Sequence, residues 1–123
     1  MKIFIVDDEP IVSRALTRAF VSAGHDVTTA ASGDEAIALW TGVKPDLVLL
    51  DVFMPGFSGP QVLQKLKEEN KLGKETIVLM TAHSTVKSRE QALNVGAHEF
   101  VQKPFENVFK LVEDLTRLVQ KNV

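Results

Sequence analysis

Residues 46–59 read DLVLLDVFMPGFSG, in which an apolar run of four residues lies between two aspartates and stops at a Pro-Gly turn. A short continuous apolar run bounded by turn residues is typical of a strand that is buried on both faces of a parallel sheet. Asp51 then stands at the carboxyl end of a central strand. Ligands of open α/β sheets bind at that edge, because the loops that leave neighbouring strands diverge there.

Strand-like apolar runs and helical patterns alternate along the whole chain, which is typical of a parallel sheet wound with helices. The most polar of the predicted strands, over 26–30 and 98–102, are expected at the edges of the sheet. We therefore expect an α/β fold of the flavodoxin-like (βα)5 type, a doubly wound five-stranded parallel sheet with strand order 2-1-3-4-5. The predicted elements are strands over 2–6, 26–30, 47–51, 75–80 and 98–102, and helices over about 10–23, 32–44, 58–69, 84–95 and 107–121.

The size and composition of the chain limit what it can be. With 123 residues, 45% of them hydrophobic and 24% charged, it is expected to form one domain over residues 1–123. It has no cysteine, which excludes disulfides, thiolate catalysis and cysteine-based zinc sites. The net charge of -2 provides no basic field for direct nucleic-acid binding. No targeting segment or apolar run of about 18 residues is present, so we expect a cytoplasmic protein without a membrane partner.

Polar side chains gather at one edge of the predicted sheet. Asp7 and Asp8 follow the first strand, Asp51 ends the third, and Thr81 and Lys103 come at the ends of the fourth and fifth. Neighbouring strands are about 4.8 Å apart, which places Asp51 within about 5–7 Å of Asp7 or Asp8. Carboxylates at so short a distance from one another must share a proton or attract a cation. Since the ligands are oxygens and no imidazole is near in sequence, Mg²⁺ is the expected cation rather than zinc.

This combination of side chains is suited to phosphoryl transfer. Asp51 offers a carboxylate nucleophile, a divalent metal and Lys103 neutralise charge on the transferring oxygens, and Thr81 donates a hydrogen bond. In a purely structural interpretation, Asp7 and Asp8 cap the first helix and Lys103 forms a salt bridge. Capping alone does not account for five polar residues at a single edge.

The same residues resemble the receiver domain of bacterial two-component response regulators. The matching motifs are spread over the whole chain: Asp7-Asp8, Asp51-Val52-Phe53-Met54-Pro55 with Gly59, Thr81-Ala82, Gly96-Ala97, and Phe100-Val101-Gln102-Lys103-Pro104-Phe105. The resemblance implies that Asp51 accepts a phosphoryl group from the phosphohistidine of a sensor histidine kinase or phosphotransfer protein. It also implies that the domain promotes its own phosphorylation and dephosphorylation without being a turnover enzyme.

The resemblance further implies a magnesium site. Asp8, Asp51 and the backbone carbonyl of Phe53 would ligate Mg²⁺, and Asp7 would act mainly through a metal-bound water.

The resemblance also implies which residues contact the phosphoryl group. Lys103 would bind a phosphoryl oxygen, Thr81 and Ala82 would contact the group from the neighbouring strand, and the bond from Lys103 to Pro104 would be cis.

A switch is expected from Thr81 and Phe100. The charge of a phosphoryl group can draw the Thr81 hydroxyl inward. In receiver domains the aromatic residue three positions before the lysine fills the vacated space, so the resemblance implies that Phe100 rotates inward. This changes the face formed by the elements over 84–95, 98–102 and 107–121, which then binds a downstream protein target or forms a phosphorylation-dependent dimer. In a purely structural interpretation, Phe100 is a half-buried aromatic residue on an edge strand.

Phe53 and His83 are expected to modulate dephosphorylation. They stand two residues after Asp51 and two residues after Thr81, positions that border the path of the hydrolytic water in receiver domains. A bulky Phe53 would shield the acyl phosphate, whereas His83 would orient water or have no role.

Three other functions compete with the receiver interpretation. A flavin-binding module needs a loop of hydroxyl groups after the first strand, where the acidic residues 7–9 would repel a phosphate. An aspartate-based phosphohydrolase needs a second acid two residues after the nucleophile, where Phe53 stands. A receiver-like scaffold that acts without phosphorylation is the main alternative. As a receiver, the chain is either a stand-alone regulator or the amino-terminal part of a longer one.

Overall fold

The computed structural model of the chain describes residues 1–82, 90–91 and 93–122. A single parallel sheet has the order β2-β1-β3-β4-β5, so the predicted topology and the two predicted edge strands are confirmed. Two strands begin one residue later than predicted, and β4 also ends one residue later. The strands are β1 (Lys2–Val6), β2 (Asp26–Ala30), β3 (Leu47–Asp51), β4 (Thr76–Thr81) and β5 (Glu99–Gln102).

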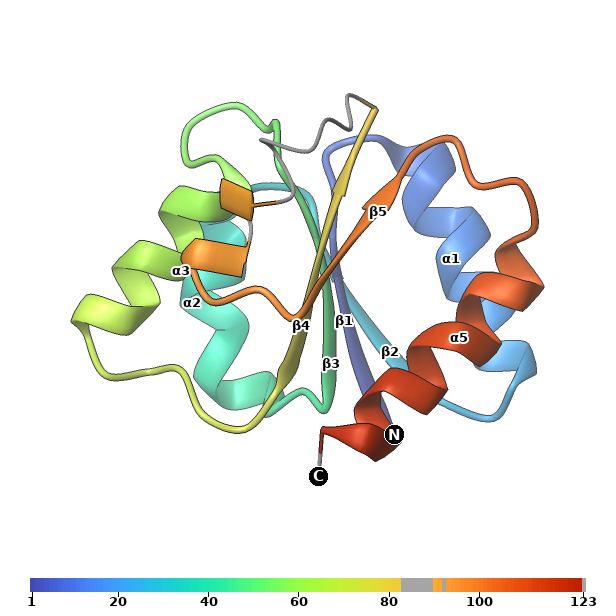
Figure 1. Cartoon of the computed structure of the whole chain (residues 1–123). Helices are drawn as coiled ribbons and strands as arrows, with labels where there is room; N and C mark the ends of the chain where they lie inside the picture. The colour runs from blue at the N-terminus through green and yellow to red at the C-terminus, as the bar shows by residue number, and fades with distance from the viewer. Residues whose placement is uncertain (83–89, 92, 123) are drawn as a thin grey trace.

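Helices cover both faces of the sheet (Figure 1). The helices α2 (Gly33–Val43) and α3 (Gly59–Glu68) lie on one face, and α1 (Pro10–Ser22) and α5 (Val108–Lys121) lie on the other. Of the helix predicted over 84–95, residues 90–91 and 93–94 are helical, whereas 84–89 and 92 lie outside the described residues.

The helix starts follow from local sequence. Ser58 and Gln61 form a capping box at the start of α3, with each side chain accepting a hydrogen bond from the other residue's backbone N–H. The Ser32 hydroxyl accepts the N–H of Glu35 at the start of α2, and the Asn107 side chain accepts two N–H groups at the start of α5. These contacts fix where each helix begins and therefore the length of the loops that leave the sheet.

The strands alternate their side chains between two cores. Phe4 and Val6 of β1 point into the core under α2 and α3, and Ile3 and Ile5 point into the core under α1 and α5. All five residues of β3 are buried, as expected for a central strand covered on both faces. The carboxyl edge of the resulting sheet carries the polar residues. None of the described helices is long and apolar enough to cross a membrane.

Candidate functional site

Strand register brings the predicted polar residues to one edge of the sheet. Val6 pairs with Leu50 and Asp51 pairs with Met80, so Asp7 follows β1 directly beside the end of β3. The loops beyond the strands are also tied to one another. The N–H of Val52 donates to the carbonyl of Met80 at 2.9 Å, and the N–H of Lys103 donates to the carbonyl of Thr81 at 2.7 Å.

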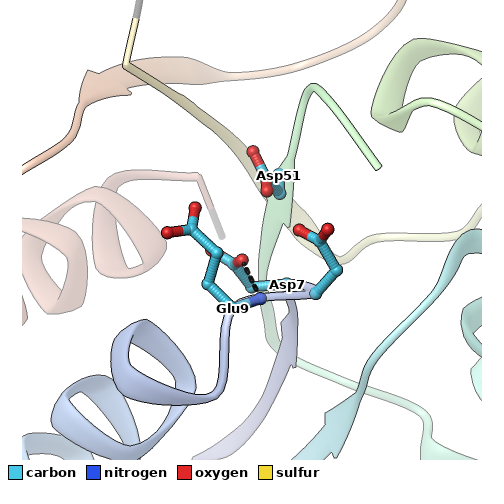
Figure 2. Close-up of side chains that lie close together, drawn as sticks. Asp7, Glu9 and Asp51 are labelled. Atoms are coloured by element: carbon cyan, nitrogen blue, oxygen red, sulfur yellow. Dashed lines mark hydrogen bonds between the residues drawn. The ribbon is translucent and has the colours of Figure 1, made fainter. Parts of the chain in front are cut away.

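Four carboxylates meet at this edge, and we call them the acidic cluster: Asp7, Asp8, Glu9 and Asp51. One oxygen of each lies within 4.8 Å of the others, which is closer than the spacing expected from the sequence. Asp7 and Asp51 are buried, whereas Asp8 and Glu9 are exposed. Figure 2 shows Asp7 and Glu9, from the loop after β1, next to Asp51 at the end of β3.

The Lys103 ammonium is held by three members of the acidic cluster. Its Nζ lies 2.9 Å from Glu9 Oε1, 3.1 Å from Asp7 Oδ2 and 3.3 Å from Asp51 Oδ2. The residue is only 7% exposed, so a lysine from the loop after β5 is buried against the end of β3. Its side chain thus reaches across the strands to Asp51.

The electrostatics of the cluster favour a proton on Asp51. Burial and the charge of Asp7 raise the pKa of Asp51 to about 7, although the Lys103 charge acts in the opposite direction. Burial lowers the pKa of Lys103, but its hydrogen bonds to Glu9 and Asp7 and the nearby carboxylate charges outweigh burial, and the net shift is upward. Lys103 therefore stays charged while Asp51 titrates near neutral pH.

The acidic cluster fits a hard divalent cation. Among the described residues, four carboxylates gather there and Lys103 is the one cation bound to them. Burial and the charge of Asp7 raise the pKa of Asp51 in spite of the Lys103 charge. All donors in the cluster are oxygens, which is the ligand chemistry that Mg²⁺ prefers.

A cleft of about 430 Å³ opens beside Asp51 and is lined by Glu9, Asp51, Phe53, Ala82 and Lys103. The Phe53 side chain is 64% exposed at its rim. The cleft reaches the Asp51 carboxylate, which is otherwise buried.

The remaining predicted residues are placed as follows. Thr81 is buried at the end of β4, next to the exposed Ala82. The Lys103–Pro104 peptide bond is cis, as the resemblance implied. Phe100 is 6% exposed and packs in the core under α2 and α3, so the interpretation as a half-buried aromatic is wrong for this structure. His83 lies outside the described residues.

The sequence interpretation did not single out Glu9 as a site residue. Its side chain makes the shortest of the three contacts to Lys103, and its backbone N–H donates to Asp7 Oδ1 at 2.9 Å (Figure 2). The sequence feature that could have identified Glu9 is its place directly after Asp8. Glu9 also occupies the N-cap position of α1, without a capping side-chain bond, so Asp7 and Asp8 are not helix caps.

Gly59 is needed where α3 meets the end of β3. A Cβ atom at this position would lie 2.5 Å from the carbonyl oxygen of Asp51 and 3.2 Å from a methyl group of Leu79. The Gly59 N–H also donates to the carbonyl of Val52 at 2.9 Å. The first turn of α3 is thus packed directly on the backbone of Asp51.

Comparison with known proteins points to one family. The family model described as "Response regulator receiver domain" matches residues 3–116. The chain is 39% identical over 103 residues to the probable transcriptional regulatory protein TcrX of Mycobacterium tuberculosis, which covers 84% of this chain and 43% of TcrX. It is 34% identical over 120 residues to the regulatory protein AtoC of Escherichia coli, which covers 98% of this chain and 24% of AtoC. The chain thus spans less than half the length of these relatives.

Solved structures agree with this match. The chemotaxis protein CheY4 of Vibrio cholerae has a TM-score of 0.86 at 28% identity, over 94% of this chain and 96% of that one. The receiver domain of the Francisella response regulator 1452 has a TM-score of 0.88 at 23% identity, over 99% and 98% of the two chains, and shows the same fold.

Proposed function

The chain belongs to the response regulator receiver family, and from this premise we propose that Asp51 accepts a phosphoryl group in a two-component phosphorelay. Receiver domains are signalling domains that interact with sensor kinases or phosphotransfer proteins and bind Mg²⁺ at an acidic pocket. The observation that supports the proposal best is the position of Asp51. It is a buried carboxylate that lines an open cleft, 3.3 Å from a buried lysine.

The proposed transfer is a displacement at phosphorus. A carboxylate oxygen of Asp51 attacks the phosphorus of a phosphohistidine and forms a P–O bond. The P–N bond breaks, and its electron pair leaves on the imidazole, which takes up a proton. The attacking oxygen must be deprotonated, so a pKa of about 7 leaves a sizeable unreactive fraction at neutral pH until more positive charge joins the cluster.

We propose that Asp8, Asp51 and the backbone carbonyl of Phe53 ligate Mg²⁺ directly, and that Asp7 does so through water. Asp8 is exposed, so its carboxylate is accessible to a metal from solvent, which supports a direct contact. Asp7 is buried and already bound to Lys103, which supports a contact through water. When bound, Mg²⁺ supplies positive charge that offsets the repulsion among the carboxylates and the negative charge on the transferring oxygens.

Lys103, Thr81 and Ala82 are the proposed contacts of the phosphoryl group. Lys103 already lies against Asp51 and carries its charge under all ordinary conditions, since its pKa is raised. It therefore stabilises negative charge on the phosphoryl oxygens. Ala82 lines the same cleft, where its small side chain leaves room for the group, and Thr81 offers a hydroxyl from the end of β4.

Phe53 and His83 are proposed to set the lifetime of the phosphoryl group. Phe53 lies at the rim of the cleft, where its ring would restrict the approach of water to the acyl phosphate.

The proposed switch shifts a population rather than creating a new state. Phe100 is already buried in this structure, so an arrangement with the ring inside the core needs no phosphoryl group. A Thr81 hydroxyl drawn toward a phosphoryl group favours that arrangement further. The face that includes β5 and α5 then binds a downstream protein target or forms a phosphorylation-dependent dimer.

We propose that residues 1–123 are a receiver domain, acting in the cytoplasm without direct contact to nucleic acid or membrane. Its partners are a sensor histidine kinase or phosphotransfer protein and a downstream protein. It promotes its own phosphorylation and dephosphorylation and is not a turnover enzyme. The main alternative is a phosphorylation-independent scaffold.

Intact mass measurement tests this proposal. The chain is incubated with Mg²⁺ and acetyl phosphate, a small donor that provides no kinase contacts. A gain of one phosphoryl group is expected, which an excess of chelator and the Asp51→Asn substitution both abolish. A protein that gains no mass here or with a phosphorylated histidine kinase would be a scaffold instead.

A further inference from the structure

Three carboxylates surround the Lys103 ammonium. Of its three donors, two make hydrogen bonds, to Glu9 at 2.9 Å and to Asp7 at 3.1 Å. Asp51 lies against the same ammonium as an ion pair at 3.3 Å. A phosphoryl oxygen that binds Lys103 must therefore compete with these carboxylates.

The exposed fractions of the three side chains decide which carboxylate is released. The Asp7 side chain is 0% exposed and that of Asp51 is 4% exposed, whereas that of Glu9 is 59% exposed. A buried carboxylate that loses its partner is left charged without solvation, whereas an exposed carboxylate is rehydrated at little cost. Asp7 is held further, because it accepts the backbone N–H of Glu9 at 2.9 Å. Glu9 is thus the partner that Lys103 releases most readily.

The phosphoryl group itself favours this release. It brings about two negative charges to Asp51. An oxygen of Glu9 lies within 4.8 Å of an oxygen of Asp51, and both residues line the same cleft (Figure 2). The new charge repels the Glu9 carboxylate and attracts the Lys103 ammonium.

We propose that Glu9 is a positioning residue that competes with the phosphoryl group for Lys103. It holds the ammonium over Asp51 in the unphosphorylated chain and exchanges with a phosphoryl oxygen when Asp51 is modified. Glu9 thereby lowers the affinity of the site for a phosphoryl group. This inference rests on the proposed acceptance of a phosphoryl group by Asp51.

A double-mutant cycle on the full chain tests the competition. The probe is beryllofluoride with Mg²⁺, a stable mimic of the phosphoryl group, and the readout is its dissociation constant by calorimetry. Glu9→Gln should tighten binding by about three- to tenfold, and in a Lys103→Met background this gain should fall below about twofold. Glu113→Gln, at an exposed position on α5, removes the same charge and should leave the dissociation constant of beryllofluoride unchanged.

Three outcomes would overturn the role of Glu9: no gain with Glu9→Gln, an equal gain in the Lys103→Met background, or a loss of affinity for Mg²⁺ alone of about tenfold or more. The second would show that Glu9 acts through its charge only, and the third would make it a metal ligand. If the unaltered chain does not bind the mimic at all, the proposed function fails. If it binds and Glu9→Gln changes nothing, only the competition fails.

Discussion

Asp51 is a buried carboxylate that makes stability depend on pH in a direction opposite to that of most acids. Its pKa is raised to about 7 in the folded chain, so the folded state keeps a proton that the unfolded state has lost. The stabilisation from neutral Asp51 is complete below about pH 4 and is lost as the pH rises through about 7. The metal-free protein should therefore lose stability between those values.

Urea denaturation at about pH 5 and about pH 8, without divalent metal, measures this effect. The single tryptophan, Trp40, is buried against Phe4 and reports unfolding by its fluorescence. The Asp51→Asn protein should lose less stability between the two pH values and should be the more stable of the two at the higher one. An equal loss in both proteins would show that Asp51 is not the titrating group.

Lys103 is the only cation bound to the acidic cluster among the described residues. Lys103→Met should lower the free energy of unfolding of the metal-free protein by about 3 kcal/mol, because it leaves buried carboxylates without a partner. Mg²⁺ should stabilise this variant more than the unaltered protein. The measurement is urea denaturation with and without Mg²⁺, and Lys110→Met, at an exposed position on α5, is the control. Equal losses in the two variants would contradict this account of the cluster.

At the scale of residues, the sequence predicted the site because each polar residue directly follows or ends a predicted strand. Asp7, Asp51 and Lys103 were found in this way. The contact of Glu9 with Lys103 depends on the conformation of a long exposed side chain, which no sequence pattern encodes. The burial of Phe100 was also missed, since a short, half-polar strand gives no indication of the helices packed over it.

At the scale of elements, the junction of β3 and α3 sets the position of Asp51. Gly59→Ala should destabilise the protein by about 1–3 kcal/mol and reduce phosphoryl uptake, because the new methyl group overlaps the Asp51 carbonyl. Gly42→Ala in α2 is a matched control, since a Cβ atom there meets nothing within 4 Å. It should leave uptake unchanged and stabilise the helix by up to about 1 kcal/mol.

Thermal denaturation and the rate of mass gain with acetyl phosphate measure the two glycine variants. If Gly59→Ala keeps both its stability and its uptake, the packing of α3 does not position Asp51.

Element boundaries were predicted closely where local capping sets them, as at Ser58 for α3. They were less accurate in β4, which begins at Thr76 and extends to Thr81. Both ends depend on distant partners, because the N–H of Thr76 donates to the carbonyl of Asp46 and the Thr81 carbonyl accepts the N–H of Lys103. A local apolar pattern cannot reveal such contacts, which come from other strands and loops.

For the whole molecule, the proposed switch couples Asp51 to the face that includes β5 and α5. Phosphoryl uptake at Asp51 should slow hydrogen exchange in β5 and α5, because the arrangement with Phe100 buried becomes more populated. The amides of β2, at the opposite edge of the sheet from β5, serve as the internal control (Figure 1). Hydrogen exchange with mass spectrometry, before and after phosphorylation, measures this. A change confined to the loops around Asp51 would contradict the switch.

The topology of the described residues could be predicted from alternating strand and helix patterns, because each local preference agrees with the final sheet order. The order of the strands followed from which runs are apolar throughout and which are half polar. The contact of Glu9 with Lys103 could not be predicted, since it depends on distances below the spacing of strands.

The central claim is that Asp51, and no other carboxylate of the acidic cluster, carries the phosphoryl group. After reaction with acetyl phosphate and Mg²⁺, the protein is treated with borohydride, which reduces an aspartyl phosphate to homoserine, and its peptides are analysed by mass. The account predicts homoserine at position 51 alone. Homoserine at Asp7 or Asp8, or a phosphoryl group that survives on a hydroxyl or imidazole, would contradict it.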